Sequence, residues 1–432
     1  PPGYDASGAP AGHPGHVDRS WSDRAVVGIA VITAIGVRTE SPGGVVLTAF
    51  AAMPFLWPRR RLLWIGVAVL VGVVGAVRSG DGWRSLEPDR LGPVEGWVRV
   101  IDDPQPYPSS TRVILEVEGE RFEMWSRGRA QQQRVMRWRG GESIRVAGER
   151  LALDAERAER VAWQHVVGRF DLDWVGDVAA GSPVARASNR VRGAIERSAQ
   201  FVPEPHGALF RGLVIGDDRE QPRDMIERFR ASGLSHLTAV SGQNVAFVLA
   251  SFGPLLVRLR PWPRWLLTLA VIAWFVVITR FEPSILRAGV MAGLTATAFM
   301  TGRERSTLRI LAATVTALLL VDPLLAWSVG FWLSVGATAG VCTVGPWLAR
   351  RFEPLGPVAL PLGITLGAQL GVVVPSVLVF GRLPLVSIVA NLLAVPVAGA
   401  VMLYGLPAGL LAGLLADAAP AFGQVVMFPA RV

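Results

Sequence analysis

Long apolar runs occupy the beginning and the second half of this chain. Three runs lie near the N-terminus, at residues 25–37, 45–57 and 62–77. The others follow residue 234, at residues 235–257, 265–279, 284–300, 308–321, 324–348, 358–380 and 385–415. A helix needs about 20 mostly apolar residues to cross a bilayer. The pattern therefore predicts a polytopic α-helical membrane protein, with N-terminal transmembrane segments over 25–80 and a larger transmembrane domain over 234–432.

A different pattern separates these two parts. Over residues 81–183, apolar side chains occupy every second position in stretches that begin at Val94, Val113 and Ile144. Clusters of proline, glycine and serine bound these stretches, as they bound half-buried β-strands. About five such strands predict a small all-β domain, either a barrel or a sandwich. Residues 184–233 then change to amphipathic helices and a linker.

Composition changes this picture in three ways. The 432 residues are 51% hydrophobic and 18% charged, which agrees with a membrane protein that carries one water-exposed insert. The single cysteine, Cys342, excludes an intrachain disulfide and a cysteine-rich zinc site. Residues 1–24 are rich in glycine, proline and polar residues and predict a disordered tail. The first residue is proline and the last residues lie near an apolar segment, as expected for a fragment of a longer protein.

Arginine clusters predict the orientation in the membrane. The net charge is +9 and every basic residue except histidine is arginine. Clusters lie in every second loop, at residues 59–61, 258–264, 303–309 and 350–351. The positive-inside rule places these loops and the N-terminus in the cytoplasm. We therefore expect a multi-pass protein of the cytoplasmic membrane whose all-β domain lies outside.

A polar segment opens the apolar part after residue 234. It carries His236, Ser241, Gln243 and Asn244 just before and within an apolar run. Polar groups at membrane depth are costly unless they meet one another, water or a substrate. The segment either lines a polar path through the membrane or forms a turn at the level of the lipid headgroups.

Other residues within the apolar runs indicate a path or close packing. Arg287 lies a few residues inside one run, where it either reaches the outer surface or points inward to attract an anion. Gln369 and Asn391 interrupt the last runs, as polar groups do in transporters with broken helices. Gly336 and Gly340 form a GxxxG pattern, which predicts close contact between helices.

The β-rich part holds a candidate surface for nucleic acid. Residues 121–150 contain eight arginines against three glutamates, with two tryptophans among them. Arginine suits phosphate groups and aromatic rings suit bases, as in proteins that bind single strands. The alternative is a solvated loop beside two core tryptophans. The candidate DNA-binding residues are Trp125, Arg127, Arg129, Arg134, Arg137, Trp138 and Arg139.

The sequence shows no enzyme motif. It lacks the HExxH, GxSxG and P-loop patterns and any histidine-rich metal cluster, so we predict no catalytic residue, no metal site and no cofactor. Asp217 and Asp218 either bind a metal or cap a turn.

Four stretches, in this order, resemble the ComEC/Rec2 family of competence proteins, the inner-membrane channels for DNA uptake. They are Gly233–Gly242, Ser284–Ala292, Asp322–Pro323 with Gly330–Ser334, and the spaced residues Gln369, Pro375, Asn391 and Pro396. The N-terminal part resembles the family in organisation, with a few spans before an exported OB-like domain thought to meet DNA. The resemblance implies that residues 81–183 form this OB-like extracytoplasmic domain and 234–432 the competence-type channel domain.

Two departures from the family pattern are visible. Many members have Ser-Gly-Leu-His-Val where this chain has Ser-Gly-Gln-Asn-Val at residues 241–245, and Asn244 can form hydrogen bonds but cannot titrate near neutral pH. Many members also carry a metallo-β-lactamase-like nuclease domain. Its His-x-His-x-Asp-His run does not occur here, so no nuclease activity is assigned to this chain.

The resemblance implies a channel for the uptake of single-stranded DNA during natural transformation. Its expected lining residues are His236, Ser241, Gln243, Asn244, Arg287, Gln369 and Asn391. The expected partners are single-stranded DNA, the lipid bilayer, and other competence proteins such as a DNA receptor and a cytoplasmic translocase. Two alternatives are a membrane-embedded enzyme that uses His236 and Ser241 on a lipid-linked substrate, and a small-anion transporter.

Overall fold

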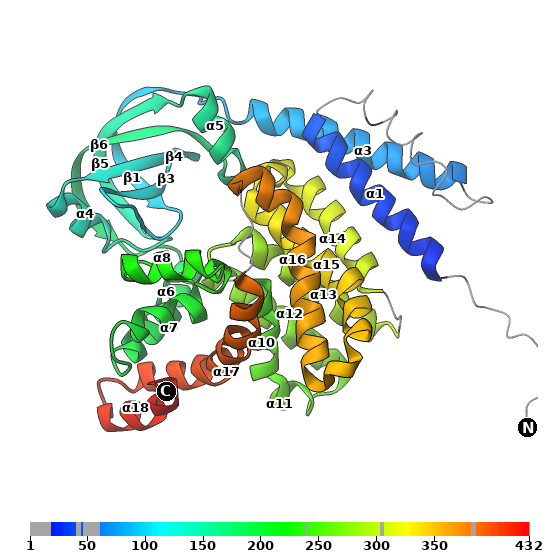
Figure 1. Cartoon of the computed structure of the whole chain (residues 1–432). Coiled ribbons are helices and arrows are strands. Elements are labelled where there is room, and N and C mark those ends of the chain that lie inside the picture. Colours follow the sequence, from blue (N-terminus) through cyan, green and yellow to red (C-terminus); the bar gives the residue numbers. More distant parts are fainter. Residues whose placement is uncertain are drawn as a thin grey trace, which may run out of the picture.

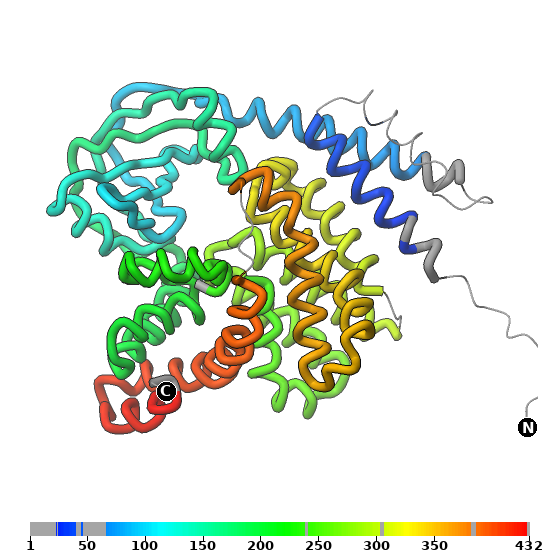
Figure 2. Tube along the Cα trace, in the orientation of Figure 1, coloured from blue at the N-terminus to red at the C-terminus, as the bar shows by residue number. Residues whose placement is uncertain are grey.

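The computed structural model describes residues 19–39, 45, 61–238, 241–302, 306–381 and 386–431. Most of the predicted tail at 1–24 and of the apolar run at 45–57 lies outside the described residues. Figure 1 shows a β-domain beside a larger body of helices, and Figure 2 follows the chain between them. Two N-terminal helices, α1 (Arg19–Thr39) and α3 (Arg61–Arg84), pack side by side and lie along one edge of the helical body.

The β-domain is a sheet that closes on itself. Its six strands lie in the order β1-β5-β6-β4-β3-β2, and β1 also pairs with β3 through Arg99–Glu116 and Val100–Leu115. Strands β4 and β6 are parallel, and the other pairs are antiparallel. The strands are β1 (Gly92–Val100), β2 (Gln105–Pro106), β3 (Ser110–Val117), β4 (Glu120–Arg127), β5 (Ser143–Ala152) and β6 (Val166–Ala179). The described chain therefore has a small barrel where the alternation predicts an all-β domain.

The alternating side chains fill the barrel. The inward positions form one apolar cluster that includes Val98, Leu115, Phe122, Ile144 and Phe170. A two-residue turn at Glu118 and Gly119 joins β3 to β4, with φ angles of 52° and 94°. Such left-handed angles match the twist of the flanking strands, and glycine adopts them without strain. Short helices α4 (Arg129–Val135), α5 (Ala155–Val161) and η2 (Ala162–Gln164) lie in the connections.

The helical body follows the barrel. Three helices, α6 (Pro183–Ala199), α7 (His206–Ile215) and α8 (Arg223–Ala231), connect the barrel to it. The remaining elements are α9 (Ser235–Thr238), α10 (Gly242–Ser251), α11 (Gly253–Leu256), α12 (Pro261–Ile278), α13 (Pro283–Met300), α14 (Thr307–Val321), η3 (Pro323–Trp327), α15 (Val329–Arg351), η4 (Glu353–Val358), α16 (Ala359–Phe380), α17 (Ser387–Leu414), α18 (Pro420–Val426) and η5 (Phe428–Arg431).

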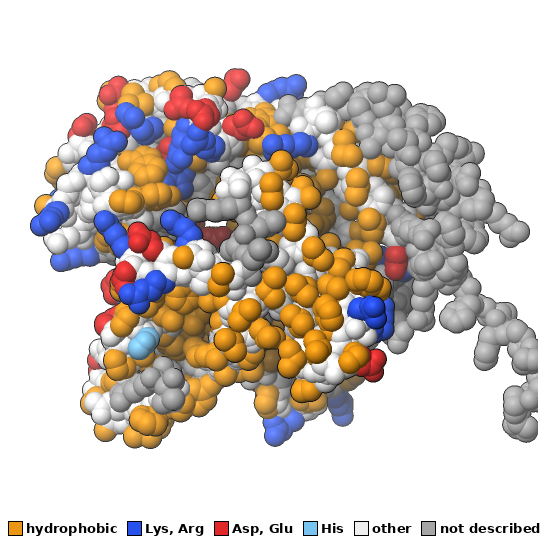
Figure 3. Space-filling model, in the orientation of Figure 1, with side chains coloured by type: hydrophobic (Ala, Val, Ile, Leu, Met, Phe, Trp, Pro, Cys, Tyr) orange, Lys and Arg blue, Asp and Glu red, His pale blue; other side chains and the backbone are white. Residues whose placement is uncertain are grey.

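Among the described residues, four helical segments are long and apolar enough to cross a membrane: α12, α15, α16 with η4, and α17. Hydrophobic side chains cover much of the helical body in Figure 3, whereas charged side chains gather over the barrel. Within the predicted run at 385–415, residues Ser387–Leu414 form one helix, α17, which contains Pro396 and Pro407. A lipid-facing helical body with a water-exposed barrel agrees with this distribution.

The apolar run at residues 235–257 does not form one continuous helix in the part of the chain that the structure describes. The described residues form three short helices there, and the longest, α10, has only 10 residues. Pro254 lies in the first turn of α11, and because proline lacks an amide hydrogen it cannot continue the hydrogen bonds of α10. The chain is thus broken at the polar segment rather than continuous through it.

The prediction of close helix contact at Gly336 and Gly340 is confirmed. These residues of α15 face Gly371 and Gly367 of α16. A Cβ atom on Gly340 would lie 2.0 Å from the carbonyl oxygen of Gly367, and one on Gly336 would lie 2.4 Å from that of Gly371. The two backbones therefore touch, which only glycine allows at these positions.

Candidate functional site

The polar turn, described at residues 235–238 and 241–244, connects α10 to α7 through two side chains. Ser241 precedes the first turn of α10, and its hydroxyl donates to Oδ1 of Asn244 over 3.1 Å. Asn244 is buried, and its Nδ2 donates to the carbonyl oxygen of Leu213 on α7 over 3.0 Å. The local geometry therefore satisfies both polar groups and ties α10 to α7.

Arg287 meets this turn from α13. The side chain is 5% exposed, and its Nε donates to Oγ of Ser334 on α15 over 2.9 Å. A Cβ atom on Gly242 would lie 2.8 Å from Nη2 of Arg287, so the guanidinium lies against the start of α10. Within the described residues, Arg287 has no carboxylate partner. The structure thus places an uncompensated cation where α10, α13 and α15 meet.

The other candidate lining residues fall into two groups. Gln369 of α16 approaches Ser387 of α17, with 3.4 Å between Oε1 and Oγ, and Oδ1 of Asn391 is buried without a hydrogen-bond partner among the described residues. His236 and Gln243 are exposed on the polar turn. The structure therefore brings Ser241, Asn244 and Arg287 together but leaves His236 and Gln243 on the surface.

Four of the candidate DNA-binding arginines remain available to a ligand. Arg127, Arg129, Arg134 and Arg137 are exposed around α4, and none of their guanidinium groups has a hydrogen bond or ion pair in the part of the chain that the structure describes. Arg139 differs, because its guanidinium pairs with Glu196 of α6. Four free guanidinium groups at one end of the barrel form a surface that suits phosphate groups.

The two candidate tryptophans have different environments. Trp138 is 2% exposed within the barrel core, so the prediction that it stacks on DNA is wrong for this structure: a ring enclosed by apolar side chains offers no face to a base. Trp125 is half-buried, and its ring lies 4.9 Å from that of Tyr107 and 5.5 Å from the guanidinium of Arg157. Trp125 stays a candidate only as part of this cluster.

Sequence reasoning missed two exposed aromatic residues. Trp97 of β1 and Trp174 of β6 are about half exposed, and each pairs with a residue of β5, namely Arg145 and Ala147. They lie on the outer side of the barrel wall. The sequence pattern indicates the exposure of Trp97, because this residue occupies an outward position in the alternation between Val94 and Val100.

An ion-pair network joins the barrel to the helical body. Asp103, in the loop after β1, accepts hydrogen bonds from Arg192 of α6 and from Arg280, which follows α12. Arg192 also donates to the carbonyl oxygens of Ile215 and Ile278 over 2.8 and 3.0 Å. Burial raises the pKa of Asp103, but Arg192 and Arg280 outweigh it and hold that pKa well below its usual range. No sequence pattern predicts this network, because its members lie far apart in the chain.

Asp217 belongs to the same region. Its carboxylate pairs with Arg219 over 2.7 Å, and Arg219 also pairs with Glu196 of α6. Among the described residues, no group of three or more potential ligands could hold a metal ion. Asp217 also accepts a hydrogen bond from the backbone nitrogen of Arg219 over 3.3 Å, which agrees with the predicted role in a turn.

Replacing Arg192 by methionine should lower the free energy of unfolding by about 3–5 kcal/mol, because it leaves Asp103 and two buried carbonyl groups with fewer partners. The matched control is Arg190→Met on the same helix, since Arg190 is exposed and has no partner in the described chain. Thermal unfolding of the detergent-solubilised protein measures the stability of both variants. Equal melting temperatures for the two variants would contradict the structural role of Arg192.

Stability should also depend on Asp102. Burial, with a further contribution from Asp103, raises the pKa of Asp102 from 3.8 to about 6. The folded state then binds more protons than the unfolded state between these values, so stability falls as pH rises from about 4 to 6. Asp102→Asn should remove this fall and add about 1–3 kcal/mol at pH 7. Melting temperatures at pH 4 and 7 check this, with the exposed Asp173→Asn as control; a parallel pH dependence in both variants would contradict it.

Comparisons with known proteins point to one family. The family model described as Competence protein matches residues 213–432. The chain is 26% identical to the uncharacterized protein YcaI of Escherichia coli over 257 residues, and 26% identical to ComE operon protein 3 of Bacillus subtilis over 228 residues. It is 30% identical to competence protein ComA of Neisseria gonorrhoeae over 199 residues. No solved structure matches the chain.

The alignments cover only part of these relatives. They include 56%, 52% and 44% of this chain but 33%, 28% and 28% of YcaI, ComE operon protein 3 and ComA, so they span about a third or less of each relative's length. The family match includes every candidate lining residue of the helical body and leaves out the barrel. The four apolar helices and this match together agree with a membrane protein.

Proposed function

This chain belongs to the competence protein family, and from that premise we propose that it passes single-stranded DNA inward across the cytoplasmic membrane during natural transformation. The observation that carries the proposal is Arg287, a buried cation without a carboxylate partner among the described residues. An ionisable group in such a place favours a pathway for an ion of opposite charge. DNA is a dense polyanion, and single hydrogen-bonding groups such as Ser334 can guide it without holding it tightly.

We assign an OB-like fold to the barrel. Five strands close a ring in the order β1-β3-β4-β6-β5, with β4 and β6 parallel and α4 between β4 and β5. OB-folds are five-stranded Greek-key barrels, and many bind oligonucleotides. This architecture supports a DNA-receiving role for the domain outside the membrane.

The proposed DNA surface lies at the end of the barrel near α4. The outer face of β3 and β4, which many OB-folds use, is covered here by α5 and η2. Ile114 packs against Val161 and Val166, and Glu123 pairs with Arg112 and Arg157. The exposed arginines Arg127, Arg129, Arg134 and Arg137 then form the free surface.

The orientation follows from the arginine clusters, with the N-terminus in the cytoplasm and the barrel outside. In this arrangement a DNA receptor would deliver DNA to the barrel, and a cytoplasmic translocase would draw the strand from the other side. The chain itself acts as a channel in this proposal and performs no catalytic step.

Deleting the gene in a naturally competent host tests the function. DNA should still bind at the cell surface, but labelled DNA should no longer become nuclease-resistant inside the cell, and transformants should disappear. Expression of the chain from a plasmid should restore both. Unchanged transformation in the deletion strain would overturn the proposal.

A second test separates a channel from an enzyme. Ser241 directs its hydroxyl to Asn244, and His236 is exposed, so the two have no hydrogen bond in the described structure. His236→Ala should therefore keep transformation within about threefold of the wild type, a change below 0.7 kcal/mol. A loss of several hundredfold at equal protein level would instead favour catalysis on a lipid-linked substrate.

A further inference from the structure

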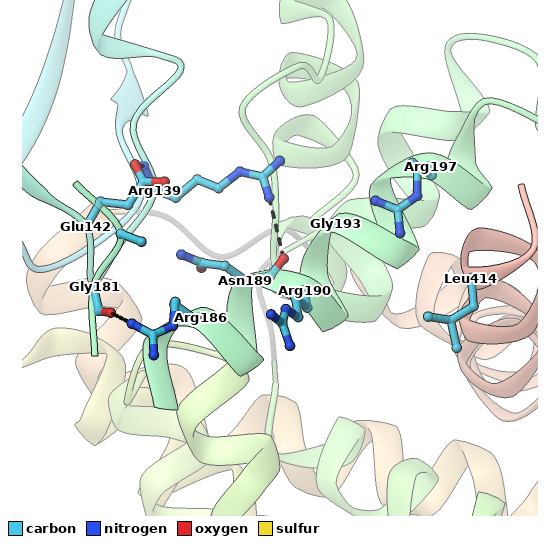
Figure 4. Close-up of a pocket in the computed structure, with 10 residues that line it drawn as sticks. Arg139, Glu142, Gly181, Arg186, Asn189, Arg190, Gly193, Arg197 and Leu414 are labelled. Carbon is cyan, nitrogen blue, oxygen red and sulfur yellow. Dashed lines mark hydrogen bonds between the residues drawn. The ribbon is translucent and has the colours of Figure 1, made fainter. Parts of the chain in front are cut away.

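A cleft with an arginine-rich wall separates the barrel from α6 (Figure 4). Its volume is about 540 Å³. The barrel contributes Arg139 and Glu142, α6 contributes Arg186, Arg190 and Arg197, and Leu414 at the end of α17 lies at the far side. The cleft thus touches the barrel, the connecting helix and the last candidate span.

Three of these arginines form a stripe along α6. Arg190 and Arg197 follow Arg186 by four and eleven positions. At 3.6 residues per turn, the three lie within about 40° of one another around the helix and extend over roughly 16 Å of its length. The stripe is long enough to contact more than one phosphate group of an extended strand.

No carboxylate among the described residues neutralises the charge of the stripe. Arg186 donates to the carbonyl oxygen of Gly181 over 2.8 Å, and Arg197 to that of Gly413 over 3.0 Å. Arg190 has no partner in the described part of the chain. A carbonyl oxygen orients a guanidinium group but leaves its full charge, so three positive charges face the cleft.

The other two charged residues of the cleft, Arg139 and Glu142, already have partners. Arg139 pairs with Glu196, and Glu142 accepts a hydrogen bond from the backbone nitrogen of Arg139 over 2.8 Å. Two of the arginine side chains lie against Gly193: a Cβ atom there would lie 3.2 Å from Nη1 of Arg139 and 3.6 Å from Nη1 of Arg197. The net charge of the cleft is therefore positive, and its centre has room for a ligand.

We propose that this cleft holds the phosphodiester backbone of single-stranded DNA on its way from the barrel to the helical body. The proposal rests on the proposed function and adds a place on the route. Arg139, which lines the cleft, follows the four exposed arginines around α4 in the chain, the last of them by two residues. None of the described lining residues is aromatic, so the cleft contacts phosphates and reads no base sequence.

Binding of a fluorescent oligothymidylate to the full chain in neutral phosphatidylcholine nanodiscs tests the cleft. The triple variant Arg186→Gln, Arg190→Gln and Arg197→Gln should bind at least about tenfold more weakly at low salt. The slope of the logarithm of its binding constant against the logarithm of salt concentration should be smaller in magnitude by about 2. Arg190→Gln alone, which removes no described contact, should lower the slope by about 0.7. The control variant Arg258→Gln, Arg260→Gln and Arg350→Gln removes the same charge from exposed sites elsewhere and should bind like the wild type.

Three other results would overturn the proposed DNA site in the cleft. An unchanged slope in the triple variant, with salt-dependent binding by the wild type, overturns the cleft and leaves the proposed function standing. Equal DNA binding, combined with loss of the rise in melting temperature that added phosphatidylglycerol gives the wild type, would assign the cleft to a lipid headgroup and overturn the proposal. Absence of DNA binding by the wild type, together with normal transformation after gene deletion, would overturn both.

Discussion

Replacing Arg287 by methionine should lower transformation by at least about 30-fold while the folded protein stays in the membrane. Arg287 is buried and reaches Ser334 and the start of α10, yet no carboxylate among the described residues balances its charge. Loss of a desolvated charge contact to an anion costs about 2–5 kcal/mol, and each 1.4 kcal/mol is a factor of ten. Methionine keeps most of the apolar volume and removes an unpaired cation, so folding should suffer little.

Transformation frequency at equal membrane levels of the protein measures this effect. Arg351→Met is the matched control, because Arg351 is exposed at the end of α15 and should tolerate the change. Arg287→Lys should recover part of the activity, since it restores charge without the planar fork of arginine. If Arg287→Met transformed within threefold of the wild type, Arg287 would be a packing residue and the proposed path would lose its main support.

Replacing Gly340 by valine should separate α15 from α16 and remove most of the folded protein. The first carbon of the new side chain would lie 2.0 Å from the carbonyl oxygen of Gly367 and 3.1 Å from the Cα of Gly371. Both neighbours are backbone atoms, so relief requires moving a whole helix. We expect a loss of about 4 kcal/mol or more in the free energy of unfolding.

Gly330→Val supplies the control for this prediction. Gly330 lies in the first turn of the same helix but is exposed, and the nearest atom to its Cβ position is Oγ of Ser328 at 3.9 Å. Size-exclusion chromatography and thermal unfolding in detergent should show a normal peak for Gly330→Val and an aggregated or absent one for Gly340→Val. A normal melting temperature for Gly340→Val would mean that the two helices do not touch as described.

Local patterns predicted those parts of the fold whose contacts lie close in sequence. The alternation around Val94, Val113 and Ile144 places β1, β3 and β5, because a strand buries every second side chain whatever its partner is. The helix contact at Gly340 also follows from spacing alone, since small residues four apart share one face. The length of the apolar run did not predict the structure at residues 235–257, where a proline and the hydrogen bonds of Ser241 and Asn244 interrupt the helix.

The candidate site was predicted by residue type but not by environment. Arg287 was expected either at the outer surface or inside, and only packing against α10 and α15 shows that it is buried. Trp138 and Trp97 both lie in the β-rich segment of the sequence, yet Trp138 is buried in the barrel and Trp97 faces outward. The difference depends on how the sheet closes, which requires the pairing of β1 with β3.

By itself the sequence determined the membrane class, the alternation of the barrel strands, the glycine contact and the family resemblance, because each depends on neighbouring residues or on a short motif. Tertiary structure alone decided which charges meet. Asp103, Arg192 and Arg280 are brought together from three distant segments, and the stripe on α6 becomes one wall of a cleft only when the barrel and α17 take their places beside it. Charges act through space over a few ångströms, so their roles follow from distance in the fold and not from order along the chain.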